Sequence, residues 1–459
     1  MKSRCQNPLS LIQSTPRSTP GKFTIMASNT VDNLTATDIS SSLPNAATCA
    51  TVESAPVVIS CGSDITFVGI VDDSTTFDDI RLPISFRTVC GRASSTNKWT
   101  YTGDEALYSL AMRFGETIRP IDRGLVVDWE AMEKVYHHAF YNVLQIDPSE
   151  QPLLIVEAPL TPKANRIRTA SIMVNTFNVP SFLFVQSATM CVYQSRRQTG
   201  LVIESGSDVT FTTPCVNGYV ISHAIQRRNI GRNQLCQQLK QLLLEQEEGS
   251  LQVPSEVHES NVACHIEDIF ERFCFVRSGD SRAEDEIILR HRHVMDSVPA
   301  AECTEYELSW GGVCSIGDRA KSQAAEVLFD PSVVSSTGGG GEGEAKKSNH
   351  EETEKVGLHE MVHSSIYKCE TELHSDLFGT VILAGTNTML PGLGERLKKE
   401  LEQMMLQEGI IHNVNVRSHP RRRCLGWLGG RSLGINLKAM LITSDEFKEC
   451  GKVTPEFGE

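Results

Sequence analysis

The sequence predicts an α/β protein made of two duplicated lobes, each a mixed β-sheet flanked by helices, with a central cleft between them. The first observation behind this prediction is an internal repeat: residues 58–67 (VISCGSDITF) align with residues 202–211 (VIESGSDVTF), with seven identities and one Ile/Val exchange. The second is that short apolar runs alternate with amphipathic helical patterns along the chain. The third is the length of 459 residues, which exceeds the usual size of one domain.

The N-terminal segment, residues 1–55, is rich in Ser and Thr and poor in aromatic residues. Such a segment buries too little apolar surface to offset the entropy lost on ordering, so we expect a disordered tail. Before Asp32 it carries four basic residues and no acidic one. That composition also occurs in organelle transit peptides, although no amphipathic apolar stripe accompanies the charges here.

Each copy of the repeat is typical of a hairpin, with a β-branched strand, a Gly-Ser turn and a second strand. A tight glycine turn lets backbone N–H groups approach phosphate oxygens without an intervening side chain. Two equivalent turns around one phosphate chain would form a nucleotide cleft. The alternative is a pair of unrelated hairpins that share turn chemistry.

Four further segments agree with an α/β lobe around each copy. Residues 130–142 have the apolar spacing of an amphipathic helix, with Met132, Val135, Ala139, Phe140 and Val143 on one face. Residues 393–405 repeat this pattern with Leu397, Leu401 and Met404. The apolar runs 153–156 and 381–383 are typical of short buried strands.

Between about residues 333 and 356 the composition changes to four consecutive glycines, Gly338–Gly341, followed by mixed Glu and Lys with almost no apolar residue. This composition predicts a flexible surface insert.

Composition also excludes several classes of protein. The net charge of −14 argues against direct binding of nucleic acid, which needs a basic face. The fourteen cysteines have no C-x-x-C pair, so we expect thiols rather than a zinc site or disulfides. Neither an apolar run long enough for a membrane span nor a secretory signal is present, so no membrane association is expected.

Longer sequence blocks identify the type of cleft. The chain resembles the actin and actin-related protein family from about Ala55 to Lys448, through the runs YTGDEA (101–106), DWEAMEK (128–134), HHAFYN (137–142), EAPLTPKANR (157–166), GY (218–219), GR (231–232), NTMLPG (387–392) and WLGG (427–430). The chaperone and sugar-kinase branches of the same ATPase superfamily share the hairpins but not the HHAFYN and EAPL blocks. The resemblance implies an actin-like ATPase fold. Lobe 1 would be residues 56–197, completed by about 425–459, and lobe 2 residues 198–424.

The first hairpin departs from the family pattern at the residues that handle the nucleotide. Ser60 stands where the family has an aspartate that holds magnesium through water, and Phe67 stands where a lysine reaches the phosphates. A serine hydroxyl brings no charge to a magnesium site. Asp64 and Asp208 replace glycines that face phosphate, and a carboxylate about 4 Å from a phosphate oxygen would cost on the order of 4 kcal/mol unless it turns away or recruits a cation.

The second hairpin also lacks catalytic features. Its leading acid is Glu204, one methylene longer than the family aspartate, and Ser207 replaces a second aspartate. In the family, a glutamine and a histidine position the attacking water. Gln186 keeps the glutamine, but Phe211 stands at the histidine position and cannot relay a proton. We therefore expect no catalytic residues and no metal ligands.

On the base and ribose side, Gly385 is kept, while Thr386 replaces a glycine against the nucleotide and Phe270 replaces a lysine. Glu271 is kept and Arg423 replaces a lysine, although both could also be ordinary surface charges. The vestigial nucleotide-binding residues implied by the resemblance are Gly62, Ser63, Glu204, Ser205, Gly206, Glu271, Gly385, Thr388, Met389 and Arg423. No cofactor is assigned with certainty; weak binding of ATP or ADP with magnesium stays open.

Three other groups invite a functional interpretation. The histidines at 291 and 293, and those at 359 and 363, have metal-compatible spacing, but no acid or cysteine completes either set. The run Arg421–Arg423 could hold an anion, but a solvated loop is favoured. These arginines could also activate the neighbouring Cys424.

The family's filament contacts are altered too. Only residues 93–102 separate Gly91-Arg92 from Gly103-Asp104, where polymerising actins carry a longer docking loop, and the glycine-rich insert stands where the family has an apolar plug. Arg123 replaces a commonly methylated histidine. A homopolymer is therefore not expected.

Three functions follow from this pattern. We expect a divergent actin-related protein, a pseudo-ATPase scaffold in a cytoskeletal or other multiprotein assembly of the cytoplasm, with protein partners. The alternatives are an actin-like ATPase that still cycles nucleotide, and a nuclear subunit of a chromatin-remodelling complex; no clear basic localisation signal supports the last.

Overall fold

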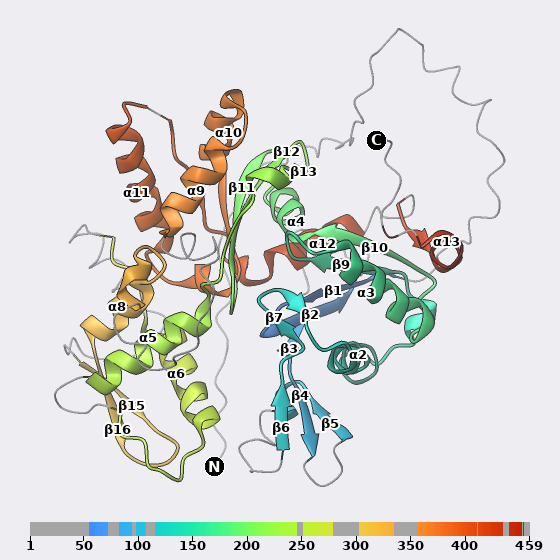
Figure 1. Ribbon diagram of the computed structural model, residues 1–459, viewed down its shortest axis with the longest axis horizontal. Coiled ribbons are helices and arrows are strands. Elements are labelled where there is room, and N and C mark those ends of the chain that lie inside the picture. The colour runs from blue at the N-terminus through green and yellow to red at the C-terminus, as the bar shows by residue number, and fades with distance from the viewer. Residues whose placement is uncertain are drawn as a thin grey trace, which may run out of the picture. The chain divides into compact units, whose positions relative to one another are not determined.

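The computed structural model describes residues 55–71, 82–93, 98–106, 115–245, 251–278, 303–334, 356–410, 412–434, 440–451 and 453. Two mixed β-sheets organise this part of the chain (Figure 1). The first sheet has the strand order β19-β10-β9-β1-β2-β3. Its strands are β1 (Val57–Cys61), β2 (Ile65–Ile70), β3 (Ile84–Arg87), β9 (Leu153–Glu157), β10 (Ser181–Gln186) and β19 (Ile442–Thr443).

The second sheet repeats the central arrangement of the first. Its order is β13-β12-β11-β17-β18, and β14 also pairs with β12. In each sheet an antiparallel hairpin, β1–β2 or β11–β12, has its first strand paired in parallel with a later strand, β9 or β17. The strands are β11 (Gly200–Ser205), β12 (Thr210–Val216), β13 (Tyr219–Val220), β14 (Gln226–Arg228), β17 (Val381–Ala384) and β18 (Val416–Arg417).

Each sheet has its own hydrophobic core. In the first core, Val57, Ile59 and Leu153 pack with residues of α2 (Trp129–His137) and α3 (Lys163–Asn175). In the second core, Leu201, Ile203 and Leu383 pack with α5 (Arg232–Glu245), α6 (Glu259–Phe273), α8 (Asp318–Glu326), α9 (Leu358–Tyr367), α10 (His374–Phe378) and α11 (Leu393–Gln407). We call the first sheet with the helices that share its core the first lobe, and the second sheet with the helices that share its core the second lobe.

Two helices that pack against each other join the lobes. α12 (Leu425–Gly434) packs on the first sheet, where Trp427 lies against Val58 and Leu154. α4 (Ser187–Gln194) packs on the second sheet, where Cys191 and Val192 contact its buried strands. A Cβ added at Gly429 would lie 2.0 Å from the carbonyl oxygen of Met190, so glycine is required for the two helices to approach this closely.

Smaller elements complete the lobes. A three-stranded sheet, β4 (Cys90–Ala93), β5 (Lys98–Thr102) and β6 (Gly115–Ile118), continues the chain beyond β3 (Figure 1). The remaining strands are β7 (Ile121–Asp122), β8 (Leu125–Val126), β15 (Cys303–Glu307) and β16 (Val313–Gly317), and the last helix is α13 (Ser444–Cys450). Short 3-10 helices occupy Pro148–Glu150, Ser222–Ala224, Pro331–Val334, Thr371–Leu373, Thr386–Met389 and Arg422–Cys424.

The sequence-based elements are confirmed with two differences. The helix expected over residues 130–142 is α2 followed by a π-helical stretch, His138–Leu144, which apolar spacing did not reveal. In α11 the buried side chain near the end is Met405 rather than Met404, because Leu393, Leu397, Leu401 and Met405 follow one another at intervals of four residues. Both expected strands are present as β9 and β17.

Some expectations lie outside the described residues. These are the N-terminal tail, the insert after Val334, and the histidines at 291 and 293. The lobe boundaries stay predictions. The free thiols of the described ranges include Cys90, Cys191, Cys215 and Cys424, as expected. The helices described by the structure include none that is long and apolar enough to cross a membrane.

Candidate functional site

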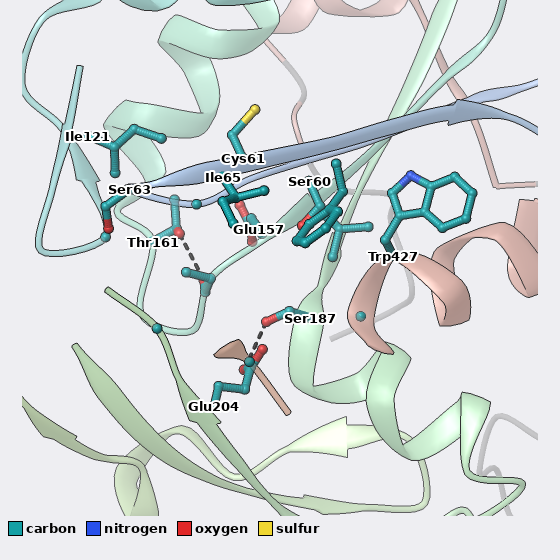
Figure 2. A pocket seen from close by; sticks show the side chains of 18 of the residues that line it. Ser60, Cys61, Ser63, Ile65, Ile121, Glu157, Thr161, Ser187, Glu204 and Trp427 are labelled. Atoms are coloured by element: carbon teal, nitrogen blue, oxygen red, sulfur yellow. Dashed lines mark hydrogen bonds between the residues drawn. The ribbon is translucent and has the colours of Figure 1, made fainter. Parts of the chain in front are cut away.

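The two hairpin turns line a single cavity of about 240 Å³, the candidate site (Figure 2). Its wall combines Gly62 and Ser63 of the first turn, Ser205 and Gly206 of the second, and Gly385 after β17. Small-molecule sites in proteins usually enclose roughly 300–1,000 Å³, so this cavity is small for a nucleotide.

The two turns have equivalent geometry. The N–H of Gly62 donates to the carbonyl of Ile65 at 2.9 Å, and the N–H of Gly206 donates to the carbonyl of Val209 at 3.0 Å. The strand registers match as well, since Ser60 pairs with Phe67 and Glu204 pairs with Phe211. This equivalence favours duplicated hairpins over two unrelated ones.

Two phenylalanines occupy equivalent positions on the second strand of each hairpin. Phe67 is partly buried and packs with the cluster that contains Trp427. Phe211 is buried, with the guanidinium of Arg227 5.9 Å from its ring centre. Both rings line the cavity, together with Ser60. These three positions therefore supply apolar surface and one neutral hydroxyl, and neither a cation nor a proton relay.

Asp64 is buried at the first turn, but it is not an unpaired carboxylate. Its Oδ2 accepts from Nη1 of Arg87 at 2.5 Å, and its Oδ1 accepts from Nη1 of Arg119 at 2.8 Å. Burial alone would raise the pKa of Asp64, but the two guanidinium groups outweigh it and hold the pKa below its usual value. Arg87 and Arg119 are thus the cations that Asp64 recruits. The repulsion of phosphate expected for an unpaired Asp64 carboxylate is corrected, because these two guanidinium groups offset its charge.

Asp208 differs from its counterpart in the first turn. It does not line the cavity, and its Oδ1 accepts from Nδ2 of Asn233 on α5 at 2.5 Å. The side chain is turned toward the start of a neighbouring helix, which is the exception stated for a carboxylate that turns away.

Glu204 is the carboxyl group that the second hairpin presents to the cavity. Ser187, the first residue of α4, donates its hydroxyl to Glu204 Oε2 at 2.9 Å, and Figure 2 shows the two side chains pointing toward each other. Burial raises the pKa of Glu204 to about 7, although the Ser187 hydrogen bond works in the opposite direction. Glu204 is therefore protonated and uncharged in a large fraction of the molecules at neutral pH.

Gln186 ends β10 and is not among the residues that line the cavity. Its buried Oε1 has no hydrogen-bond partner among the described residues. Beside it in the sheet, Glu157 does line the cavity and is held by Arg166, whose Nε donates to Oε1 at 2.7 Å and to Oε2 at 2.8 Å. The EAPLTPKANR block contains this pair, but its sequence alone did not assign the pair to the site.

A second charge cluster lies where the family resemblance implies the base and ribose of a nucleotide. Arg232 is buried, donates to Glu271 Oε1 at 2.5 Å, and lies 5.3 Å from the centre of the fully buried Phe270 ring. Arg423 donates to the same Glu271 oxygen at 3.5 Å and lines the cavity. Glu271 and Arg423 are therefore members of one cluster rather than isolated surface charges. Arg232 was not predicted as a site residue because its partner, Glu271, is 39 residues away along the chain.

Only the first residues of the segment after β17 line the cavity. Gly385 has a φ of +90° and borders the cavity together with Thr386, whose buried Oγ1 lacks a hydrogen-bond partner in the described structure. Thr388 is buried and donates its hydroxyl to the Gly385 carbonyl at 2.7 Å. Met389 is 39% exposed and does not line the cavity. Thr388 thus shapes the turn, and Met389 lies outside the cavity wall.

The remaining candidates carry no site. Across the residues described by the structure, no group of His, Cys, Asp and Glu could hold a metal ion. His359 stacks on Phe329, and His363 contacts Glu408. Burial raises the pKa of Cys424 to about 11 despite the nearby arginines, so the expected activation of this thiol is wrong.

One comparison with known protein families bears on this geometry. Residues 51–454 match the model of the family described as actin. The match includes both hairpins, both sheets and every residue that lines the cavity.

Proposed function

Because this chain belongs to the actin family, we propose that it is a divergent member that acts as a structural or interaction subunit of a multiprotein assembly and does not hydrolyse ATP. The observation that carries this proposal is the buried Phe211 ring on the cavity wall, at the position where the family resemblance implies the water-positioning histidine. An aromatic hydrocarbon can neither orient the attacking water by a hydrogen bond nor accept its proton.

Nucleotide binding should be weak for three further reasons. Ser60 offers no negative charge to a magnesium ion, and hard cations prefer anionic oxygen ligands. Glu204 is partly protonated at neutral pH, because burial raises its pKa to about 7. Thr386 lines the cavity of about 240 Å³ with a β-branched side chain, where the family resemblance implies a glycine against the nucleotide. At most, we expect weak binding of ATP or ADP with magnesium.

The assembly role rests on the family membership and on the segment from Ala93 to Thr102. β4 ends at Ala93 and β5 starts at Lys98, so only four residues connect these strands. A connection this short cannot reach into a neighbouring subunit as a long loop could. We therefore expect heterotypic protein partners in a cytoskeletal assembly of the cytoplasm rather than a filament of this protein alone.

Isothermal titration with Mg·ATP and a phosphate-release assay test the proposal. We expect weak or no binding and phosphate release at background. Low-micromolar or tighter affinity with magnesium-dependent release would instead establish the ATPase alternative.

A gain-of-function variant provides a sharper test. Restoring the family residues together through Ser60→Asp, Asp64→Gly, Phe67→Lys, Asp208→Gly and Phe211→His should increase both ATP affinity and hydrolysis. A folded quintuple variant with neither gain would contradict the roles assigned to these positions.

Imaging of the tagged protein, with affinity purification of its partners, separates the cytoskeletal role from the nuclear one.

A further inference from the structure

An ion-pair network connects the two lobes across the cleft. Arg87, at the end of β3, pairs with Asp64 of the first turn through Nη1 and with Glu267 through Nη2, at 2.5 and 2.8 Å. Arg119 adds a second contact to Asp64 at 2.8 Å. Two carboxylates and two guanidinium groups thus form one charge-balanced network.

The partners of Arg87 belong to different hydrophobic cores. Phe86, next to Arg87, is buried in the first core with Val57 and Ile59. Ile266, next to Glu267 on α6, is buried in the second core with Leu201 and Ile203. Arg87 and Glu267 lie 180 residues apart in the chain. Their contact is therefore between lobes and cannot be explained by packing within either one.

Asp64 and Arg87 stabilise each other in the ionised form. Burial alone would lower the pKa of Arg87, but Asp64 and Glu267 outweigh it and raise the pKa. The side chain of Asp64 is 9% exposed and that of Glu267 is 20% exposed. Ion pairs that are partly removed from water are screened less by salt than fully exposed pairs.

We propose that Asp64, Arg87, Arg119 and Glu267 form an interlobe latch that keeps the cleft closed without a nucleotide. Asp64 is an anion of the first turn, where the family resemblance implies the phosphate of a ligand. Arg87 binds both this carboxylate and that of Glu267 in the second lobe. The latch deepens the proposed function, because a scaffold that does not cycle nucleotide needs another means of holding its lobes together.

A second contact at the cleft supports this role. Nη2 of Arg227, on β14 of the second lobe, donates to the carbonyl of Arg123 in the β7–β8 turn at 2.8 Å. This contact and the latch both lie apart from the α4–α12 helix pair that joins the lobes. The lobes thus contact each other at two places outside this helix pair, and loss of the latch should loosen the cleft without unfolding either core.

Hydrogen exchange of the backbone amides, measured by mass spectrometry in nucleotide-free buffer, tests the latch. Glu267→Gln removes one charge while keeping the side-chain shape. It should increase exchange at residues 62–65 and 205–208 by about two- to fivefold, the change in open population expected for a partly exposed ion pair. Asp64→Asn should act on the same amides, because it weakens the same network from the other lobe.

Glu259→Gln is the matched control. Glu259 lies on the same helix, but its partner, Lys240 at 3.3 Å, is on α5 of the same lobe. This variant should leave exchange at both turns unchanged. Equal exchange in Glu267→Gln and Glu259→Gln would overturn the latch. Tight binding of Mg·ATP by the wild-type protein would instead overturn the proposed function and leave the latch standing, so the two failures are distinguishable.

Discussion

Replacing Glu204 by Gln should make the protein more stable at neutral and alkaline pH. The cavity raises the pKa of Glu204 from 4.5 to about 7 by burial. Between these two values the unfolded chain has lost this proton while the folded chain retains it, so the contribution of Glu204 to stability decreases as pH rises. The decrease is about 1.4 kcal/mol per pH unit, or about 2 kcal/mol from about pH 5.5 to about pH 7.

Urea unfolding of wild type and Glu204→Gln, measured from about pH 5.5 into the alkaline range, tests the prediction. Other titrating groups cancel in the difference between the two proteins. The stability advantage of the variant should grow by about 2 kcal/mol up to about pH 7 and then stay level. Glu402→Gln, which removes an exposed carboxylate on α11, serves as the control. A difference that is constant across the whole range would refute the assignment of Glu204 as a buried, high-pKa carboxyl.

Three further predictions concern other parts of the molecule. Cys424 should react with iodoacetamide more slowly than the exposed Cys450, because burial raises its pKa to about 11; peptide mapping that finds equal rates would contradict this. Gly429→Ala should lower stability by roughly 1–3 kcal/mol, because its Cβ would overlap the Met190 carbonyl; an unchanged thermal midpoint would show that α4 and α12 can separate at no cost. In polymerising salt with Mg·ATP the protein should form no polymers and should therefore stay in the supernatant on high-speed sedimentation. Regular filaments in electron micrographs would instead favour the ATPase alternative.

The hairpins and the secondary structure around them were predictable because their signals are local. A β-branched run, a Gly-Ser turn and a second β-branched run specify a hairpin wherever they occur. The apolar spacing of residues 393–405 likewise predicts one buried helix face, and α11 confirms it with Leu397 and Leu401 buried. Where the local signal is ambiguous, the prediction was less accurate, as in the π-helical stretch after α2.

The hydrogen-bond partners and the burial of the site residues were less predictable. Asp64 and Asp208 occupy equivalent positions in the repeat, yet the first is buried beneath Arg87 and Arg119 and the second bonds to Asn233. The partners come from different segments, so nothing in the repeat distinguishes the two aspartates. Cys424 has arginines beside it in the chain, but burial outweighs their charge, and burial depends on the packing of α12.

The sequence by itself determined the duplicated α/β architecture, the two glycine turns and the absence of charged or proton-relaying side chains at Ser60, Phe67 and Phe211. These features depend on residue type and short-range spacing, which the chain carries wherever it is placed. Only the tertiary structure decided the protonation of Glu204 and the charge network from Asp64 to Glu267. Electrostatic energy depends on distance and burial, and these are set when residues 180 positions apart are brought within hydrogen-bonding range.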